Sequence, residues 1–208
     1  MTGPLYKVML IAVAAGCLAG CHGGGGPTVT ANPPSPDGAL AHQENERAFA
    51  LIQEGKYDQA ETILKKAIAA DLTFGPAHNN LGLVYYYQKR YYDAAWEFDY
   101  AIRLMPYQPD PRNNLGLVFE ETWKYADAAD AYERARKMAP DNPEFIGNLA
   151  RVRIKRGDRD NQTRELLEEL TFKDPRPEWR DWARTKLFEF NARRPETAPT
   201  TKPARSDQ

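Results

Sequence analysis

The chain has 208 residues, of which 42% are hydrophobic and 27% are charged, and its formal net charge is −1. This near-neutral balance gives no sign, at the level of the whole chain, of a surface that binds nucleic acid or another polyanion. Once two low-complexity ends are set aside, about 150 residues remain, which is enough for one domain of ordinary size.

Residues 1–20 have the three-part layout of a secretory signal peptide. Lys7 precedes an apolar run from Val8 to Ala15, and small residues follow that run. The run is shorter than the roughly 20 residues that a helix needs to span a bilayer. We therefore expect an exported protein and not a transmembrane anchor.

The last four residues of this segment, LAGC at 18–21, resemble a bacterial lipobox. The resemblance implies that Cys21 is acylated and becomes the new N-terminus. Two alternatives stay open: Cys17, which follows AAG, and an ordinary cleaved signal with two incidental cysteines. No other cysteine is present in the sequence, so cleavage before Cys21 leaves no pair for a disulfide and the exported domain must be held by its core.

The position after Cys21 holds His22 and not aspartate. Among lipoproteins this favours the outer membrane, so we expect a lipid-anchored protein of the cell envelope on the periplasmic face. Residues 21–40 contain four consecutive glycines and then four prolines, which is a linker composition. The tail at 195–208 is rich in proline and threonine and is predicted to be disordered.

Between these ends the chain repeats itself. The hexapeptide NNLGLV begins at Asn79 and again at Asn113, a spacing of 34, which defines the units 75–108 and 109–142. In the first unit, one set of small and aromatic residues recurs at helical spacing and predicts the two packed faces of a helix hairpin; the set is Leu81, Gly82, Tyr85, Ala94, Phe98 and Ala101. Pro106 then ends the second helix.

This pattern resembles the tetratricopeptide repeat, with L-G-x-x-Y, A-x-x-x-F and a closing proline within 34 residues. His78 and Arg112 replace the initial tryptophan of the family pattern. The resemblance implies an all-α fold, a right-handed α-solenoid of helix hairpins. A single hairpin cannot cover its own apolar faces, so each unit needs a neighbour.

Two weaker units flank the clear pair. Residues 41–74 keep the skeleton with Arg47 in place of the leucine, as expected of a terminal repeat. Residues 143–176 read as a degenerate fourth repeat with a one-residue insertion near 159–163. An amphipathic helix at 177–194 would then cap the solenoid, although a partner-binding helix is the alternative reading of that segment.

No catalytic constellation is visible in the sequence. His42 and His78 could approach one another in stacked repeats, but two histidines without a third ligand make a poor zinc site. Neither a phosphate-binding glycine loop nor a nucleophile elbow is present. We expect no enzyme activity, no metal, no cofactor, no nucleic acid and no small-molecule substrate.

In the tetratricopeptide family, five positions on the first helix of each repeat line a concave groove. Carrying these positions over gives the groove candidates Asn45, Phe49, Asn79, Leu83, Tyr86, Tyr87, Asn113, Leu117, Glu120 and Arg151. Tyr86 and Tyr87 exceed what the repeat requires, and they fit either a binding hot spot or the covering of neighbouring helices. Asn79 and Asn113 are candidates for hydrogen-bonding the backbone of a bound extended segment.

One branch of the family clamps a terminal carboxylate with lysines, an arginine and asparagines. Only Asn80 agrees among the corresponding residues, which are Asn45, Phe49, Asn80, Asp110 and Asn114. The sequence therefore predicts a lipid-anchored scaffold that docks a peptide or partner protein without a carboxylate clamp. Two alternatives remain, an accessory regulator of a cell-wall enzyme and a self-associating structural protein. Tyr92 and Trp96 have no assigned role.

Overall fold

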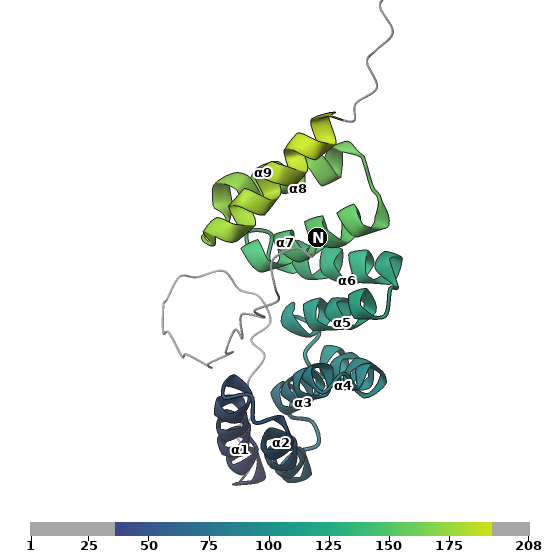
Figure 1. Cartoon of the computed structure of the whole chain (residues 1–208). Coiled ribbons are helices and arrows are strands. Elements are labelled where there is room, and N and C mark those ends of the chain that lie inside the picture. Colours follow the sequence, from purple (N-terminus) through teal and green to yellow (C-terminus); the bar gives the residue numbers. More distant parts are fainter. Residues whose placement is uncertain (1–35, 193–208) are drawn as a thin grey trace, which may run out of the picture.

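The computed structural model describes residues 36–192, and within that range the chain is entirely helical with no strand. Figure 1 shows a stack of helices that runs from α1 and α2 at one end to α8 and α9 at the other. The helices are α1 (Pro36–Gln53), α2 (Tyr57–Ala70), α3 (Gly75–Tyr87), α4 (Tyr91–Leu104), α5 (Asp110–Glu121), α6 (Tyr125–Met138), α7 (Pro143–Arg156), α8 (Asn161–Lys173) and α9 (Pro177–Ala192). The expected all-α solenoid of helix hairpins is confirmed.

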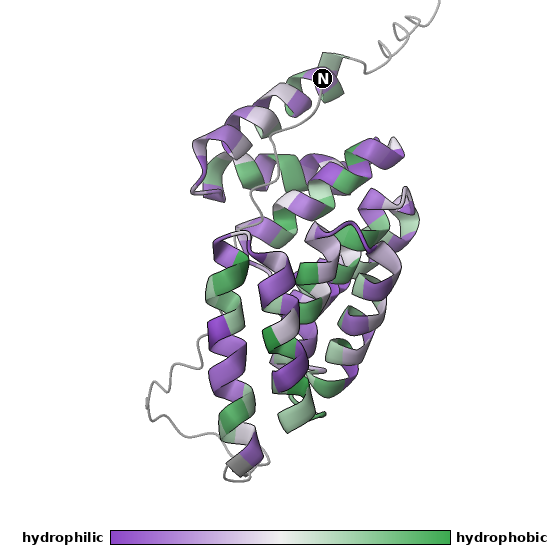
Figure 2. Ribbon diagram, turned by 60° about the horizontal axis from the view of Figure 1, so that its bottom comes forward, coloured by the Kyte–Doolittle hydropathy of each residue, from purple (hydrophilic) through white to green (hydrophobic). Residues whose placement is uncertain are grey.

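Each helix packs on its neighbours in chain order, which gives the four hairpins α1–α2, α3–α4, α5–α6 and α7–α8, followed by the single helix α9. In Figure 2 every helix carries both hydrophobic and hydrophilic segments, as expected where one face is buried against neighbours. Helix α1 begins at Pro36, inside the segment 21–40 that the sequence assigns to a linker. The predicted leader, Cys21 and the tail at 195–208 lie outside the described residues.

Within residues 36–192 the longest and most apolar helices still fall short of what a bilayer span needs.

The core of each hairpin is built on a matched pair of positions. In the second and third repeats a glycine faces an aromatic ring, and a Cβ placed on Gly82 or Gly116 would lie 2.6 Å from the ring of Phe98 or Tyr132. In the first and fourth repeats alanine takes the glycine position and leucine takes the aromatic position, as Ala48 with Leu64 and Ala150 with Leu167. Ring volume on one helix is therefore balanced by missing volume on the other.

The fourth hairpin carries the one extra residue that its sequence suggests. The buried residues Thr163, Leu167 and Leu170 of α8 lie 35 positions after their counterparts in α6, where the other repeats are spaced by 34. The extra residue falls in the turn from α7 to α8, which ends at Asp160. The Asp160 side chain accepts a hydrogen bond from the Thr163 N–H at 2.8 Å and so caps α8.

The turn inside each hairpin contains one residue in the left-handed region. These residues are Gly55, Lys89, Trp123 and Gly157, with φ of 73°, 61°, 63° and 94°. Two of the four are thus non-glycine residues in a conformation that costs an L side chain roughly 1–2 kcal/mol.

Replacing Lys89 with glycine is expected to raise the free energy of unfolding by about 1 kcal/mol, because the backbone strain disappears. Denaturant unfolding of the two proteins side by side would measure the gain. The reciprocal control is Gly55→Lys, where no atom lies within 4 Å of an added Cβ and only the backbone cost remains, so this variant should lose a similar amount. A Lys89→Gly protein that is less stable than the parent would show that the lysine side chain outweighs the strain.

Candidate interaction face

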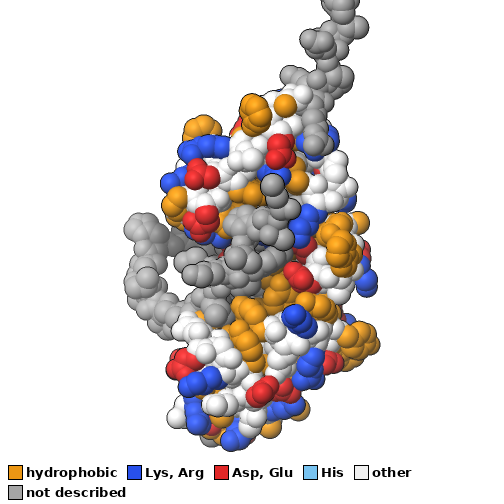
Figure 3. All heavy atoms as spheres, viewed as in Figure 1, with side chains coloured by type: hydrophobic (Ala, Val, Ile, Leu, Met, Phe, Trp, Pro, Cys, Tyr) orange, Lys and Arg blue, Asp and Glu red, His pale blue; other side chains and the backbone are white. Residues whose placement is uncertain are grey.

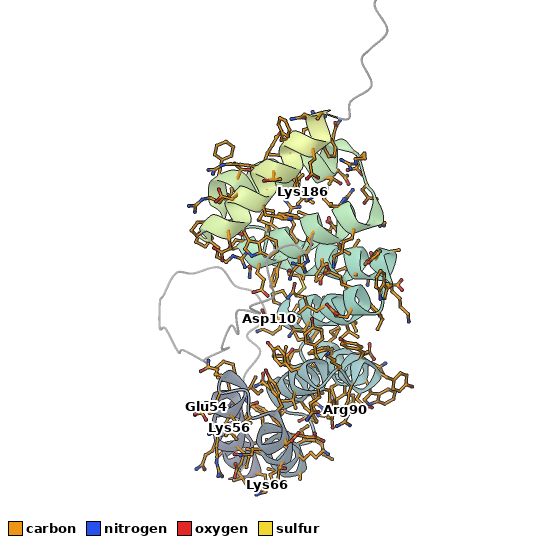
Figure 4. The ribbon with its side chains drawn as sticks, viewed as in Figure 1. Glu54, Lys56, Lys66, Arg90, Asp110 and Lys186 are labelled. Atoms are coloured by element: carbon orange, nitrogen blue, oxygen red, sulfur yellow. The ribbon has the colours of Figure 1, made fainter. Side chains whose placement is uncertain are left out.

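The first helices of the four repeats, α1, α3, α5 and α7, are joined side by side by side-chain hydrogen bonds. We call the side chains at the second, fifth, sixth, ninth, twelfth and thirteenth positions of these helices the inner face. All ten sequence candidates belong to the inner face. Asp110, labelled in Figure 4, lies at its edge, where α5 begins.

An asparagine ladder runs along the inner face. The Nδ2 group of Asn80 donates to Oδ1 of Asn45 at 2.8 Å, and Asn114 donates in the same way to Asn79 at 3.0 Å. The third rung is Asn148 to Asn113, again at 2.8 Å. Each rung joins the fifth position of one repeat to the sixth position of the next, so the ladder fixes both the register between repeats and the orientation of every amide.

The ladder leaves two amide groups available. Asn113 uses its own Nδ2 group to donate to Glu144 at 3.4 Å. The Nδ2 groups of Asn45 and Asn79 donate to no group within residues 36–192, and both side chains are half-buried. These two residues thus hold a fixed acceptor interaction on one side and present N–H donors on the other.

The ladder ends at the fourth repeat because Trp179 takes the place of the next rung. The fifth position there is Gly147, and an added Cβ would lie 2.9 Å from the Trp179 ring. The ring is flanked by the guanidinium groups of Arg176 and Arg151, at 4.7 and 5.4 Å from its centroid. Helix α9 therefore covers the end of the stack, as the sequence predicts, and also closes the inner face with one side chain.

The two tyrosines in excess of the repeat pattern pack on the chain itself. Tyr87 stacks on Tyr57 of the preceding repeat, with ring centroids 5.0 Å apart and planes 14° apart. Tyr86 contacts Tyr87 edge-on at 5.7 Å and Tyr91 at 6.0 Å. Burial raises the pKa of the Tyr87 hydroxyl well above its usual value. These contacts fit the alternative in which the two tyrosine rings cover neighbouring helices.

The apolar candidates differ in how exposed their side chains are. Leu83 and Leu117 are buried, whereas Phe49 is half-buried beside the first rung of the ladder. Of the remaining inner-face residues that the family pattern names, His42 packs its ring on Phe74 at 4.3 Å.

Glu120 and Arg151 are brought together as an ion pair between the third and fourth repeats. The guanidinium of Arg151 donates twice to the carboxylate, at 2.8 and 2.9 Å, and Lys155 Nζ lies 2.9 Å from it. The Tyr132 hydroxyl donates to the same carboxylate at 2.8 Å. The Glu120 side chain is fully buried, so its oxygens serve the contact between repeats.

The pKa of Glu120 reflects these partners. Burial alone would raise it, but the hydrogen bonds and charges of Arg151 and Lys155 outweigh burial and lower the pKa to about 2.

At the edge of the inner face, two carboxyl groups have pKa values that are raised instead of lowered. Burial raises the pKa of Glu144 to about 7 against the lowering effect of Arg176, and Asp110 adds to the rise. Burial also raises the pKa of Asp110.

Sequence reasoning did not nominate Asn80, Asn114 and Asn148 as structural partners of the candidate asparagines. The signal was present, because each doublet, at 79–80 and at 113–114, supplies the acceptor of one rung and the donor of the preceding rung. His78 was weighed as a metal ligand. In the structure its Nδ1 lies 2.7 Å from Glu97 and its Nε2 lies 3.2 Å from the carbonyl oxygen of Leu72. Across residues 36–192, no three potential ligands converge on a metal position.

Two family models, both described as tetratricopeptide repeat, match residues 45–109 and 124–182, which together exceed half of the chain. No curated protein matches it. Similar solved structures include the first such domain of Spaghetti (RPAP3) bound to the HSP90 peptide SRMEEVD, with 22% identity, a TM-score of 0.55, and coverage of 58% of this chain and 95% of that one. Another is the second domain of human RPAP3 with the HSP70 peptide SGPTIEEVD, at 22% identity and a TM-score of 0.53, covering 56% and 98%.

Proposed function

The chain belongs to the tetratricopeptide repeat family, and from this premise we propose that it is an interaction scaffold that holds an extended segment of a partner protein along its inner face. Proteins built from this repeat are in general binding modules and not enzymes. The two similar structures named above contain bound peptides, which supports a peptide-like ligand for the same fold.

The observation that carries the proposal is the pair of amide groups on Asn45 and Asn79. Their orientation is set by the hydrogen bonds from Asn80 and Asn114, so no side-chain freedom is lost when a partner binds. An N–H donor at this position suits a backbone carbonyl of an extended chain, which offers one acceptor per residue and is read without regard to its side chains.

The length of the bound segment follows from helix spacing. Neighbouring helices pack about 8–10 Å apart, so the four first helices span roughly 25–30 Å, which corresponds to about eight extended residues. Phe49, one helical turn after Asn45, and Tyr87, two turns after Asn79, are both half-buried and offer apolar contact to side chains of the partner. The inner face ends at Trp179, so the segment would not continue past the fourth repeat.

The recognised chemistry is an internal stretch of backbone and not a chain terminus. Asn45, Phe49, Asp110 and Asn114 stand where a carboxylate clamp places other groups, and none of them carries a positive charge. A terminal carboxylate near Asp110 would meet a like charge, which is unfavourable.

The cellular setting in this proposal comes from the leader. The lipobox-like motif would place an acyl anchor on Cys21 and hold the repeats at the periplasmic face of the outer membrane, where they would support the assembly of envelope machinery. A chain that recruits or regulates a cell-wall enzyme is the alternative form of the same role. Both versions place the binding event on the inner face.

The double variant Asn45→Asp with Asn79→Asp is expected to lose at least tenfold in partner capture while the fold remains intact. Aspartate still accepts the ladder bonds from Asn80 and Asn114 but offers no N–H to the partner. The measurement uses the full chain in its native membrane with a photo-crosslinking residue in place of Phe49, and follows the crosslinked partner band.

A matched control separates the lost donors from the added charge. Gln43→Glu adds a negative charge to the exposed outer side of α1 and should leave the crosslink unchanged. Undiminished crosslinking by the double aspartate variant would exclude backbone recognition by these two amides.

Replacing Cys21 with alanine is expected to abolish metabolic labelling of the protein by palmitate, because the acylated thiol is gone. The control is Cys17→Ala, which should still be labelled to the parental level. If the two variants behave in the reverse way, Cys17 is the acylated residue, and if the double variant Cys17→Ala with Cys21→Ala stays labelled the lipoprotein assignment is wrong.

A further inference from the structure

Helix α4 carries an exposed aromatic stripe on the side that faces away from the rest of the stack. Its residues are Tyr92, Trp96 and Tyr100, which are spaced by four and are 84%, 67% and 37% exposed. The opposite side of the same helix is buried through Ala94, Phe98 and Ala101. In Figure 3 hydrophobic side chains stand out at the edge of the molecule beside α4. The stripe answers the question that the sequence left open for Tyr92 and Trp96, because neither is part of the core.

The repeat fold does not require this stripe. The corresponding residues on the outer side of α6 are Ala126, Asp130 and Arg134, and on α2 they are Asp58, Thr62 and Lys66, all of them exposed. On α6 two of these residues form an ion pair, with Arg134 Nη2 2.9 Å from Asp130. The same fold therefore works with a solvated outer surface in neighbouring repeats, and contiguous exposed aromatics mark a contact surface.

The charged residues beside the stripe are already paired within the chain. Asp93 lies 2.8 Å from Arg90, and Asp99 pairs with Arg103 one turn further along. Glu97 pairs with His78 on the inner side of the helix. The stripe is thus an apolar strip between neutralised pairs, which gives no preference for an anionic membrane or a nucleic acid.

The order of the stripe is the same from both ends, because a tyrosine lies four residues before and four residues after the tryptophan. We propose that the occupant is a second copy of this chain, packed with its α4 antiparallel across a two-fold axis. In such an isologous contact a residue on the axis meets itself, and residues at equal distances on either side exchange partners. Trp96 then meets its own copy, and Tyr92 of each chain meets Tyr100 of the other.

The exposed area of the stripe limits how much surface a dimer can bury through it. A fully buried aromatic side chain removes about 150–250 Å² from solvent, so the exposed parts of the three rings supply roughly 300–450 Å² per copy. This is about half of the roughly 800 Å² that each partner buries in a stable interface of standard size. The paired charges beside the stripe add area, and the total suits a reversible dimer that keeps both inner faces open on the opposite sides.

Disulfide crosslinking of the full chain in its native membrane tests the register directly. Trp96→Cys is expected to give a crosslinked dimer on mild oxidation. Asp130→Cys, its counterpart on α6, should give no more than the parent chain, which reports any background from Cys17 and Cys21. Two differently tagged chains, one with Tyr92→Cys and the other with Tyr100→Cys, should crosslink to each other more than either does to itself.

A second measurement keeps the test independent of the crosslink. The detergent-solubilised full chain is expected to sediment as a reversible dimer, and Trp96→Glu should weaken the dimer at least 30-fold, as for a central interface residue. Circular dichroism should be unchanged because Trp96 lies outside the core. The Asn45→Asp with Asn79→Asp variant should remain dimeric and Trp96→Glu should keep its Phe49 crosslink, so failure of one site is distinguishable from failure of the other.

Three outcomes would overturn the proposal. One is a monomer whose Trp96→Cys crosslink does not exceed that of Asp130→Cys. Another is a Trp96→Cys crosslink to a protein of different mass, which would make the stripe a site for a different partner. The third is a monomer whose tryptophan fluorescence shifts to the blue on vesicles of zwitterionic lipid and does so less in Trp96→Phe, which would make the occupant a lipid surface.

Discussion

Replacing Glu120 with alanine is expected to lower the free energy of unfolding by about 3–5 kcal/mol, which is the usual cost of removing one partner from a buried ion pair. Arg151, whose side chain is 10% exposed, would keep its charge without the carboxylate that now receives two of its hydrogen bonds. Tyr132 would lose the acceptor for its hydroxyl group as well. Denaturant unfolding at neutral pH measures the loss, and hydrogen exchange should place it in α7. A loss below about 1 kcal/mol would show that this ion pair is not formed in solution.

The contact between the second and third repeats suggests substitutions that should restore the lost stability. At that contact, Tyr86 and Phe98 of the second repeat and Leu117 of the third occupy the positions that Glu120, Tyr132 and Arg151 occupy one repeat later. A triple variant that copies the apolar set, Glu120→Tyr with Tyr132→Phe and Arg151→Leu, should regain most of the loss, because apolar residues of suitable volume often replace buried ion pairs without cost.

The pH dependence has a defined sign. The pKa of Glu120 is about 2 in the fold against an ordinary value of 4.5. A lowered carboxyl pKa stabilises the fold above pH 4.5, and this contribution is lost as the pH falls towards 2. The parent should therefore lose more stability than the triple variant between pH 4.5 and 2, and an equal loss in the two proteins would contradict the pairing.

The second large effect is expected at the glycine–aromatic contact of the second repeat. Gly82→Ala in a helix would by propensity alone gain about 0.5–1 kcal/mol. Here the new Cβ would lie 2.6 Å from the Phe98 ring, so we expect a net loss of about 1–3 kcal/mol from overpacking. Phe98→Leu alone leaves a cavity and should also destabilise the fold.

The two changes together should cost much less than their sum, because the double variant recreates the pairs Ala48 with Leu64 and Ala150 with Leu167 that the chain already uses. A double-mutant cycle by denaturant unfolding gives the coupling energy. A coupling near zero would mean that these two positions do not compensate each other in volume.

The fold could be predicted from the sequence because its determinants are local and periodic. Gly82, Phe98 and their counterparts at a spacing of 34 define a hairpin, and a hairpin that cannot bury its own faces requires a stack. The extra residue before α8 was also visible, since it displaces the closing Asp174-Pro175 by one. The start of α1 at Pro36 was not predicted, because the prolines and glycine around it are typical of a linker.

The candidate site could be predicted only in part, because a position on the inner face does not determine what a side chain contacts there. Glu120 and Arg151 were expected to face a partner, but they lie on adjacent repeats at a distance that lets them satisfy each other. Asn79 was named for its donor group, yet the bond that orients it comes from Asn114, across an interface that periodicity alone does not resolve. The placement of Trp179 over Gly147 depends on the angle at which α9 packs, which no local pattern encodes.

The central claim, that an extended partner segment lies along the inner face, is tested most directly by mapping where crosslinks fall on the partner. Photo-crosslinking residues are placed in turn at Phe49 and at Tyr87 of the full chain, and the attached partner peptides are identified by mass spectrometry. Both positions are expected to label one internal stretch of about eight residues. Labels on distant parts of the partner, or on its terminal carboxyl residue, would contradict it.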